Sequence, residues 1–133
     1  MIHIYSFSFL YTKIYNHPPH TLQYTFDCRP IKNPGKIEEF REQTGLDTDV
    51  KLYLETETEM PNYLEGVNKI LKIAVNEYLS KKDRYEDLYI YFGCTGGRHR
   101  SVYAAQATTT YIKQYLSEEI ECRHLQLINE KMI

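Results

Sequence analysis

The stretch Gly93-Cys94-Thr95-Gly96-Gly97-Arg98-His99-Arg100-Ser101 joins two segments with different hydrophobic patterns. The segment before it, Asp87 to Phe92, is almost unbroken in apolar and aromatic residues, which is typical of a strand buried on both faces. Apolar residues at helical spacing follow it, from Val102 to Leu116. The sequence therefore predicts a Gly-rich turn between the end of a central strand and the start of a helix.

This turn has the composition of an anion-binding site. Gly96 and Gly97 allow a ligand to approach the backbone closely, or allow a positive φ. The N–H groups and the dipole at a helix start favour negative charge. Further donors come from side chains of the same turn: Thr95, Arg98, His99, Arg100 and Ser101. We therefore expect a phosphate or a similar anion to bind here.

The totals describe a protein of ordinary size and charge. Its 133 residues predict one domain, residues 1–133, with a single core. A formal net charge of −2 argues against coating nucleic acid through bulk positive charge. The three cysteines, Cys28, Cys94 and Cys122, are odd in number and widely spaced, which favours reduced thiols in the cytoplasm. No apolar run is long enough to span a bilayer and no secretory signal is visible, so we expect a cytoplasmic protein without a membrane partner.

Predicted strands and helices alternate along the chain. Strands are expected over residues 2–10, 22–28, 87–92 and 120–125, and helices over residues 36–43, 61–79 and 102–116. Residues 47–57 fit either a short helix or an irregular segment. Strands joined by helical crossovers pair in parallel. The predicted fold class is thus α/β, a small, mostly parallel or mixed sheet of about four strands with helices packed on its faces.

Two further pairs of residues are expected at the same edge of the sheet as the turn. Ligands of open parallel sheets bind beyond the carboxyl ends of the strands. Asp27 lies near the end of the second predicted strand and Arg29 follows it, while Arg123 and His124 lie near the end of the last one. These four residues therefore join residues 94–101 as candidate ligand-binding residues. Asn33 and Thr44 could cap or line the same pocket.

An enzymatic alternative arises from Cys94 and Arg100, which are separated by five residues and followed by Ser101. This is the spacing of cysteine-dependent tyrosine phosphatases, in which a thiolate attacks a phosphate held by the loop. Gly93 stands where a His is expected, and such a reaction also needs an acid, for which Asp27 and Asp47 are options. A small buried residue at a strand end is the simpler interpretation of Cys94. No nucleotide-binding Gly-Lys-Ser/Thr loop or paired cysteine spacing occurs, so we expect no cofactor, no metal and no catalytic residue.

Several motifs resemble the C-terminal domain of the RapZ family, the bacterial RNase adapter proteins also described as UPF0042 nucleotide-binding proteins. The order of the motifs is the same over nearly the whole chain, and Ser6 to Phe9 resembles the opening strand of that domain. The motifs are Phe26-Asp27-Cys28-Arg29-Pro30 with Asn33-Pro34, Thr44-Gly45-Leu46-Asp47, Gly93 to Val102, and Arg123-His124.

The resemblance implies an α/β domain whose Gly-rich turn binds a phosphorylated sugar or a similar anion. The best-known member senses glucosamine-6-phosphate, binds a small regulatory RNA and presents it to an endoribonuclease, and family members self-associate. The matching binding positions are Asp27, Arg29, Cys94, Thr95, Gly96, Gly97, His99, Arg100 and Ser101.

Two departures from the family limit what the resemblance implies. The half that carries the nucleotide-binding loop has no counterpart in this sequence, so nucleotide hydrolysis is not expected. RNA-binding members have a strongly basic tail, whereas residues 125–133 contain Lys131 against Glu130. Few phosphate contacts would make the counterion-release contribution to RNA affinity small.

The leading expectation is a non-catalytic sensor domain for a phosphorylated small molecule, such as an amino-sugar phosphate or another anion. The alternatives are an RNA-binding adapter module and a cysteine-dependent phosphatase that uses Cys94, Arg100 and Asp27. The expected partners are accordingly a phosphorylated metabolite or phosphate, RNA or a ribonuclease, and a second copy of the chain.

Overall fold

The computed structural model describes residues 1–14 and 16–133. Four strands form one sheet in the order β2-β3-β1-β4, and every neighbouring pair is parallel. The strands are β1 (Ile2–Ser8), β2 (Thr21–Asp27), β3 (Asp87–Cys94) and β4 (Ile120–His124). The α/β class and the predicted strand number are thereby confirmed.

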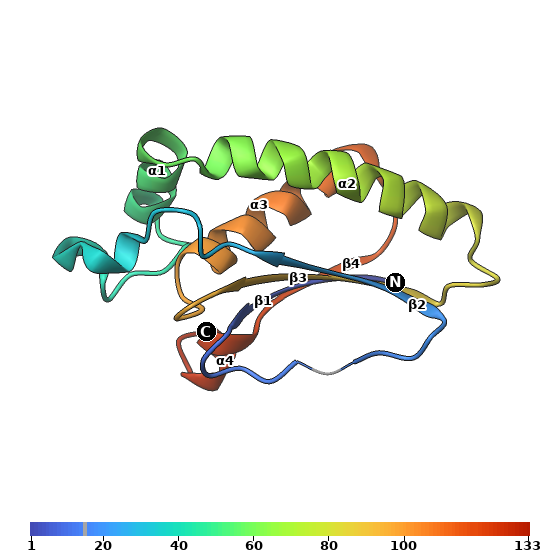
Figure 1. Ribbon diagram of the computed structural model, residues 1–133, viewed down its shortest axis with the longest axis horizontal. Helices are drawn as coiled ribbons and strands as arrows, with labels where there is room; N and C mark the ends of the chain where they lie inside the picture. The colour runs from blue at the N-terminus through green and yellow to red at the C-terminus, as the bar shows by residue number, and fades with distance from the viewer. Residues whose placement is uncertain (15) are drawn as a thin grey trace.

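Three of the helices lie on one face of this sheet (Figure 1). They are α1 (Thr48–Glu57), α2 (Met60–Ser80) and α3 (Arg100–Tyr115), and a short α4 (Leu125–Asn129) follows β4. The opposite face is covered by α4 and by the chain between β1 and β2, which contains no helix among its described residues (Figure 1). The three longer helices thus pack on one face of the sheet rather than on both.

The two faces of the sheet differ in chemistry because side chains alternate along each strand. On the helix side, Ile4 and Ile90 are fully buried in the apolar core, together with neighbours of the same parity. On the other side, Tyr89 and Tyr91 contact His17 from the β1–β2 connection. The His17 ring stacks 3.6 Å from the ring of Tyr89, and its Nε2 lies 2.6 Å from the Tyr91 hydroxyl. Aromatic residues therefore take the place of long helices on this part of the face.

The prediction of a helix over residues 36–43 is wrong. Two short 3₁₀ turns occupy this region, η1 (Pro34–Lys36) and η2 (Glu38–Phe40). Asn33 Oδ1 accepts the Gly35 N–H at 2.9 Å and stabilises the first turn. Ile37 lies between the turns with extended backbone, which interrupts a continuous helix.

Other boundaries have local causes. The first strand ends at Ser8, two residues early, because the Ser8 hydroxyl accepts the N–H groups of Leu10 and Tyr11 and starts a turn. The last strand ends at His124, which pairs with Ser6, and the chain then enters α4 instead of extending the strand to residue 125. Of residues 47–57, for which a helix and an irregular segment were both open, Thr48–Glu57 form the helix α1 and Asp47 is its N-cap.

The topology produces a crevice at the carboxyl edge of the sheet. The chain leaves β1 toward the face without α1–α3, whereas it leaves β3 toward the helix face to enter α3 (Figure 1). Because β1 and β3 are neighbours, their connections diverge and leave space beyond the strand ends. The Gly-rich turn lies at this position. None of the helices in residues 1–14 and 16–133 combines the length and apolar character needed to cross a membrane.

Gly45 provides a test of how the turn is held. Its N–H donates to Arg98 O at 2.8 Å, and a Cβ at this position would meet His99 O and would lie 2.5 Å from Tyr103 N. We expect Gly45→Ala to lower the free energy of unfolding by about 1–3 kcal/mol, since backbone atoms must move. Urea denaturation measures this loss.

Gly66→Ala is the matched control, since nothing lies within 4 Å of a methyl group added there, in the interior of α2. This change should raise the free energy of unfolding by roughly 0.5–1 kcal/mol through helix propensity. Equal effects of the two substitutions would contradict the close approach at Gly45.

Candidate functional site

The turn between β3 and α3 is shaped by close backbone packing. Gly97 has a φ of 73°, and a Cβ there would lie 2.9 Å from Ser8 N and 2.8 Å from Gln126 Cβ. The Ser8 hydroxyl donates to Thr95 O at 2.6 Å. The turn is therefore fixed against β1 and α4, and residue 97 has to be glycine.

Most backbone N–H groups of this turn have no partner within the fold. Gly97 N–H is the exception, since it donates to Cys94 Sγ at 3.3 Å. Within the part of the chain that the structure describes, the N–H groups of Thr95, Gly96, Arg98 and His99 meet no acceptor. His99 also begins α3 without a side-chain cap. Unpaired amides at a helix start are suited to binding an anion.

Cys94 and Ser101 lie buried beneath the turn and contact each other there. Cys94 is 2% exposed and Ser101 is fully buried. The Cys94 Sγ and Ser101 Oγ atoms lie 3.1 Å apart, so both side chains are engaged with each other at the junction of β3 and α3. Their contribution to the site is to fix its backbone.

Arg100 connects the turn to the chain that leaves β2. Its Nη1 donates to the carbonyl oxygens of Arg29, at 2.9 Å, and Ile31, at 2.8 Å. The residue is only 5% exposed, and its Nε is buried without a partner among the described residues. Arg100 has no carboxylate partner in residues 1–14 and 16–133, so its positive charge is not compensated by an ion pair there.

The two preceding cationic residues are engaged elsewhere. Arg98 Nε donates to Glu130 Oε2 at 2.8 Å, which ties the turn to the end of α4. His99 Nε2 lies 2.8 Å from the carbonyl oxygen of Phe40, and burial lowers the pKa of the ring. A neutral His99 that donates to Phe40 O is therefore a structural link to η2, and Arg98 and His99 add little net charge to the site.

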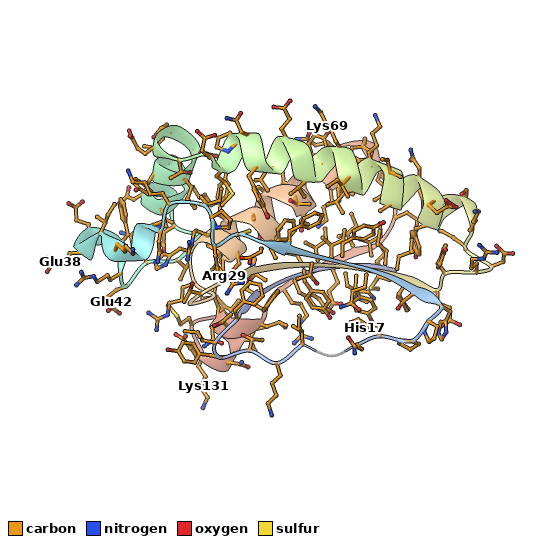
Figure 2. The ribbon with its side chains drawn as sticks, viewed as in Figure 1. His17, Arg29, Glu38, Glu42, Lys69 and Lys131 are labelled. Carbon is orange, nitrogen blue, oxygen red and sulfur yellow. The ribbon has the colours of Figure 1, made fainter. Side chains whose placement is uncertain are left out.

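Asp27 and Arg29 form an ion pair at the mouth of the crevice. The Arg29 Nη2 and Asp27 Oδ2 atoms are 2.7 Å apart, and the Arg29 guanidinium lies 4.0 Å from the centre of the Phe9 ring. Hydrogen bonding to Arg29 holds the pKa of Asp27 below its usual range. Figure 2 shows the Arg29 side chain beside the turn that joins β3 to α3. Asp27 thus orients Arg29.

Two adjoining open cavities lie at this edge of the sheet, and Asn33, Thr95 and Arg100 border both of them. The smaller one, of about 380 Å³, lies over the Gly-rich turn and is also bordered by Leu10, Tyr11, Gly35, Arg41, Glu42, Cys94, Gly96, Gly97, Arg98 and His99. The larger one, of about 920 Å³, is also bordered by Arg29, Pro30, Ile31, Lys32, Lys36, Ile37 and Tyr53.

Arg123 and His124 lie apart from these cavities and border neither of them. His124 is 4% exposed, and its Nδ1 lies 2.8 Å from Ser6 Oγ while its Nε2 lies 3.1 Å from Gln106 Oε1. Arg123 is exposed, with its Nε 3.9 Å from Glu121. The described residues contain no group of three or more His, Cys, Asp or Glu side chains placed to hold a metal ion.

Several cavity residues were not among the sequence-based candidates. Lys32 precedes η1, Lys36 is its last residue and the first residue of the segment expected to be helical, and Tyr53 comes from α1. Hydrophobic periodicity carries no signal for such positions, because they become neighbours only when α1 and η1 pack together. Asn33 both caps η1 and borders the cavities, so the two roles considered for it coincide.

The parallel sheet, the strand–turn–helix motif and the adjoining crevice define an α/β domain with its candidate site at the carboxyl edge of the sheet. The chain belongs to the RapZ C-terminal domain family, whose sequence model matches residues 1–127. The predicted family is therefore confirmed.

Curated relatives carry the name nucleotide-binding protein. One from Fervidobacterium nodosum is 34% identical over 106 residues, which cover 80% of this chain and 35% of that protein. A relative from Thermotoga sp. strain RQ2 is 35% identical over 76% of this chain and 34% of its own length. One from Vibrio cholerae is 34% identical over 82% of this chain and 37% of its own length. The chain thus spans about a third of the relatives it matches.

His124 gives a prediction about acid stability. Burial lowers its pKa to about 4, so the folded protein holds the ring neutral. Between pH 6.5 and 4 the unfolded chain protonates this histidine while the folded protein does not. The free energy of unfolding is therefore highest above pH 6.5 and falls by about 3 kcal/mol as the pH drops from 6.5 through 4. Urea denaturation between pH 7 and 4 should show a shallower pH dependence for His124→Gln than for the natural chain.

His20→Gln is the control for this measurement, since the His20 side chain is 48% exposed and its contact with Glu86, at 3.1 Å, lies at the surface, where ion pairs contribute little to stability. It should retain the pH dependence of the natural chain. A His124→Gln profile parallel to that of the natural chain would contradict a neutral, buried ring.

Proposed function

We propose that this domain is a non-catalytic binding domain for a phosphorylated small molecule, with the phosphate group on the Gly-rich turn. The observation that carries the proposal is the set of N–H groups of Thr95, Gly96, Arg98 and His99, which have no partner among the described residues, together with the positive charge of Arg100, which forms no ion pair there. A phosphate offers several acceptor oxygens to such donors, and charge-assisted hydrogen bonds are about twice as strong as neutral ones.

The smaller cavity suits a compact ligand. Its volume of about 380 Å³ lies at the lower end of the range for small-molecule sites. The family resemblance favours an amino-sugar phosphate such as glucosamine-6-phosphate. Asn33 and Thr95 border the cavity and provide polar groups that could fix the orientation of the sugar.

The phosphatase alternative has weaker support. Asp27, one option for the acid, donates no proton while Arg29 holds its pKa low, and an acid has to be protonated to assist a leaving group. Asp47, the other option, accepts the Thr44 N–H at 2.7 Å. The Cys94 thiol is packed against Ser101 under the turn. A binding role therefore accounts for more of the geometry.

The RNA-binding alternative also has weaker support. At the edge of the sheet, Arg98 is paired with Glu130 and Arg29 with Asp27, so neither cation is free for the phosphates of RNA. RNA affinity depends largely on the number of phosphate contacts. The compact turn suits a single phosphate group better than the extended phosphate backbone of an RNA strand.

Gly96→Val tests the proposal without disturbing the fold. Nothing lies within 4 Å of a Cβ added at Gly96, and the residue borders the cavity over the turn. The added side chain should fill the position of the phosphate and weaken binding of glucosamine-6-phosphate at least about tenfold, or about 1.4 kcal/mol. Isothermal titration calorimetry measures the change, with inorganic phosphate as a second probe.

Gly66→Ala, in α2 and outside both cavities, should bind as the natural chain does. Urea denaturation should show Gly96→Val within about 1 kcal/mol of the natural stability, as expected for a substitution in open space. Absence of binding by the natural chain, or full binding by Gly96→Val, would refute the site. Amide chemical shifts of Thr95 to Ser101 should move with either phosphate ligand.

A further inference from the structure

We infer that the ligand carries a second anionic group, which Lys32 and Lys36 bind in the larger cavity. The ligand class is then a phosphorylated metabolite with a second anionic group, such as a sugar bisphosphate, and glucosamine-6-phosphate would fill only the part of the site over the turn. This inference rests on the proposed function, since it assumes that the first phosphate lies on the Gly-rich turn.

The shape of the site leaves room for such a ligand. The cavity over the turn continues into a larger one of about 920 Å³ through the shared residues Asn33, Thr95 and Arg100. The second volume is near the upper end of the range for small-molecule sites. A ligand anchored on the turn therefore meets a further open space at its other end.

The charge of the larger cavity is one-sided. Arg29, Lys32, Lys36 and Arg100 border it, and no Asp or Glu is among the described residues that do so. This concentration contrasts with the chain as a whole, which has 18 acidic and 16 basic residues. Arg29 is compensated by Asp27, but neither Lys32 nor Lys36 forms an ion pair in residues 1–14 and 16–133. Their ammonium groups remain available to a ligand.

Both lysines are presented from a fixed backbone. They stand on either side of Asn33-Pro34-Gly35, where the Asn33 side chain accepts the Gly35 N–H and Pro34 is buried. The carbonyl of Ile31, next to Lys32, is held by Arg100 at 2.8 Å. Since Arg100 also begins α3, one buried side chain fixes the separation between the turn and the two lysines. The site should consequently select ligands by the spacing of their anionic groups.

The two lysines should not contribute equally. Lys32 also borders a neighbouring hollow with Glu57 and Glu59, and these carboxylates reduce the local positive potential. Lys36 borders the larger cavity but not this hollow. We therefore expect Lys36 to make the larger contribution to affinity.

The test compares glucose 6-phosphate with glucose 1,6-bisphosphate, which differ only in the second phosphate. The natural chain should bind the bisphosphate at least about tenfold more tightly by isothermal titration calorimetry. The double variant Lys32→Gln/Lys36→Gln should lose most of this preference, while its affinity for the monophosphate stays within about twofold. Lys36→Gln alone should lose more of the preference than Lys32→Gln alone.

Lys72→Gln is the control, because Lys72 is an exposed lysine of α2 that borders neither cavity. It should keep the preference of the natural chain. Equal binding of the two sugars by the natural chain, or an unchanged preference in the double variant, would overturn the second site and leave the proposed function intact. Failure of both sugars and of glucosamine-6-phosphate to bind would overturn both.

Discussion

The site depends on the hydrogen bonds from Arg100 Nη1 to the carbonyl oxygens of Arg29 and Ile31. They join the first turn of α3 to the chain that leaves β2, two segments that are far apart in the sequence and that meet only at the edge of the sheet. A buried guanidinium is costly to desolvate, and removing its partners leaves that cost uncompensated. The same contact shapes both cavities, because Arg100 borders each of them. The stability of this edge of the sheet and the geometry of the site therefore both depend on the hydrogen bonds of Arg100.

Positive charge at this edge is divided between structural and available groups. Arg98 is paired with Glu130, Arg29 is paired with Asp27, and His99 is held neutral against Phe40. These contacts position the backbone, and they leave Arg98, Arg29 and His99 with little net positive charge for a ligand. Among the described residues, what remains for a ligand is the set of amide dipoles, Arg100 and Arg41, with two lysines in the adjoining cavity. The number of Arg and His residues in the Gly-rich turn is thus larger than the net positive charge available to a ligand.

Much of the fold was predictable because its signals are local and periodic. The buried run before Gly93, the amphipathic pattern of α2 and the glycines of the turn each specify their own structure. The segment around Ile37 was mispredicted because a single apolar pair does not distinguish a helix from two tight turns. The direction in which His124 points, and the contribution of Tyr53 to a cavity, depend on how distant elements pack. Neither leaves a pattern in the sequence.

The connection between β1 and β2 performs two tasks in one segment. At its start, the Phe9 ring underlies the Arg29 guanidinium, and Leu10 and Tyr11 border the space over the turn. Further along, the His17 imidazole covers Tyr89 on the side of the sheet opposite α1, α2 and α3. The wall of the crevice and the seal over the exposed aromatic surface are consequently one stretch of chain. An insertion or deletion in this connection would displace both its contacts at the crevice and its contacts with Tyr89. Its length should therefore be constrained more tightly than that of an ordinary surface loop.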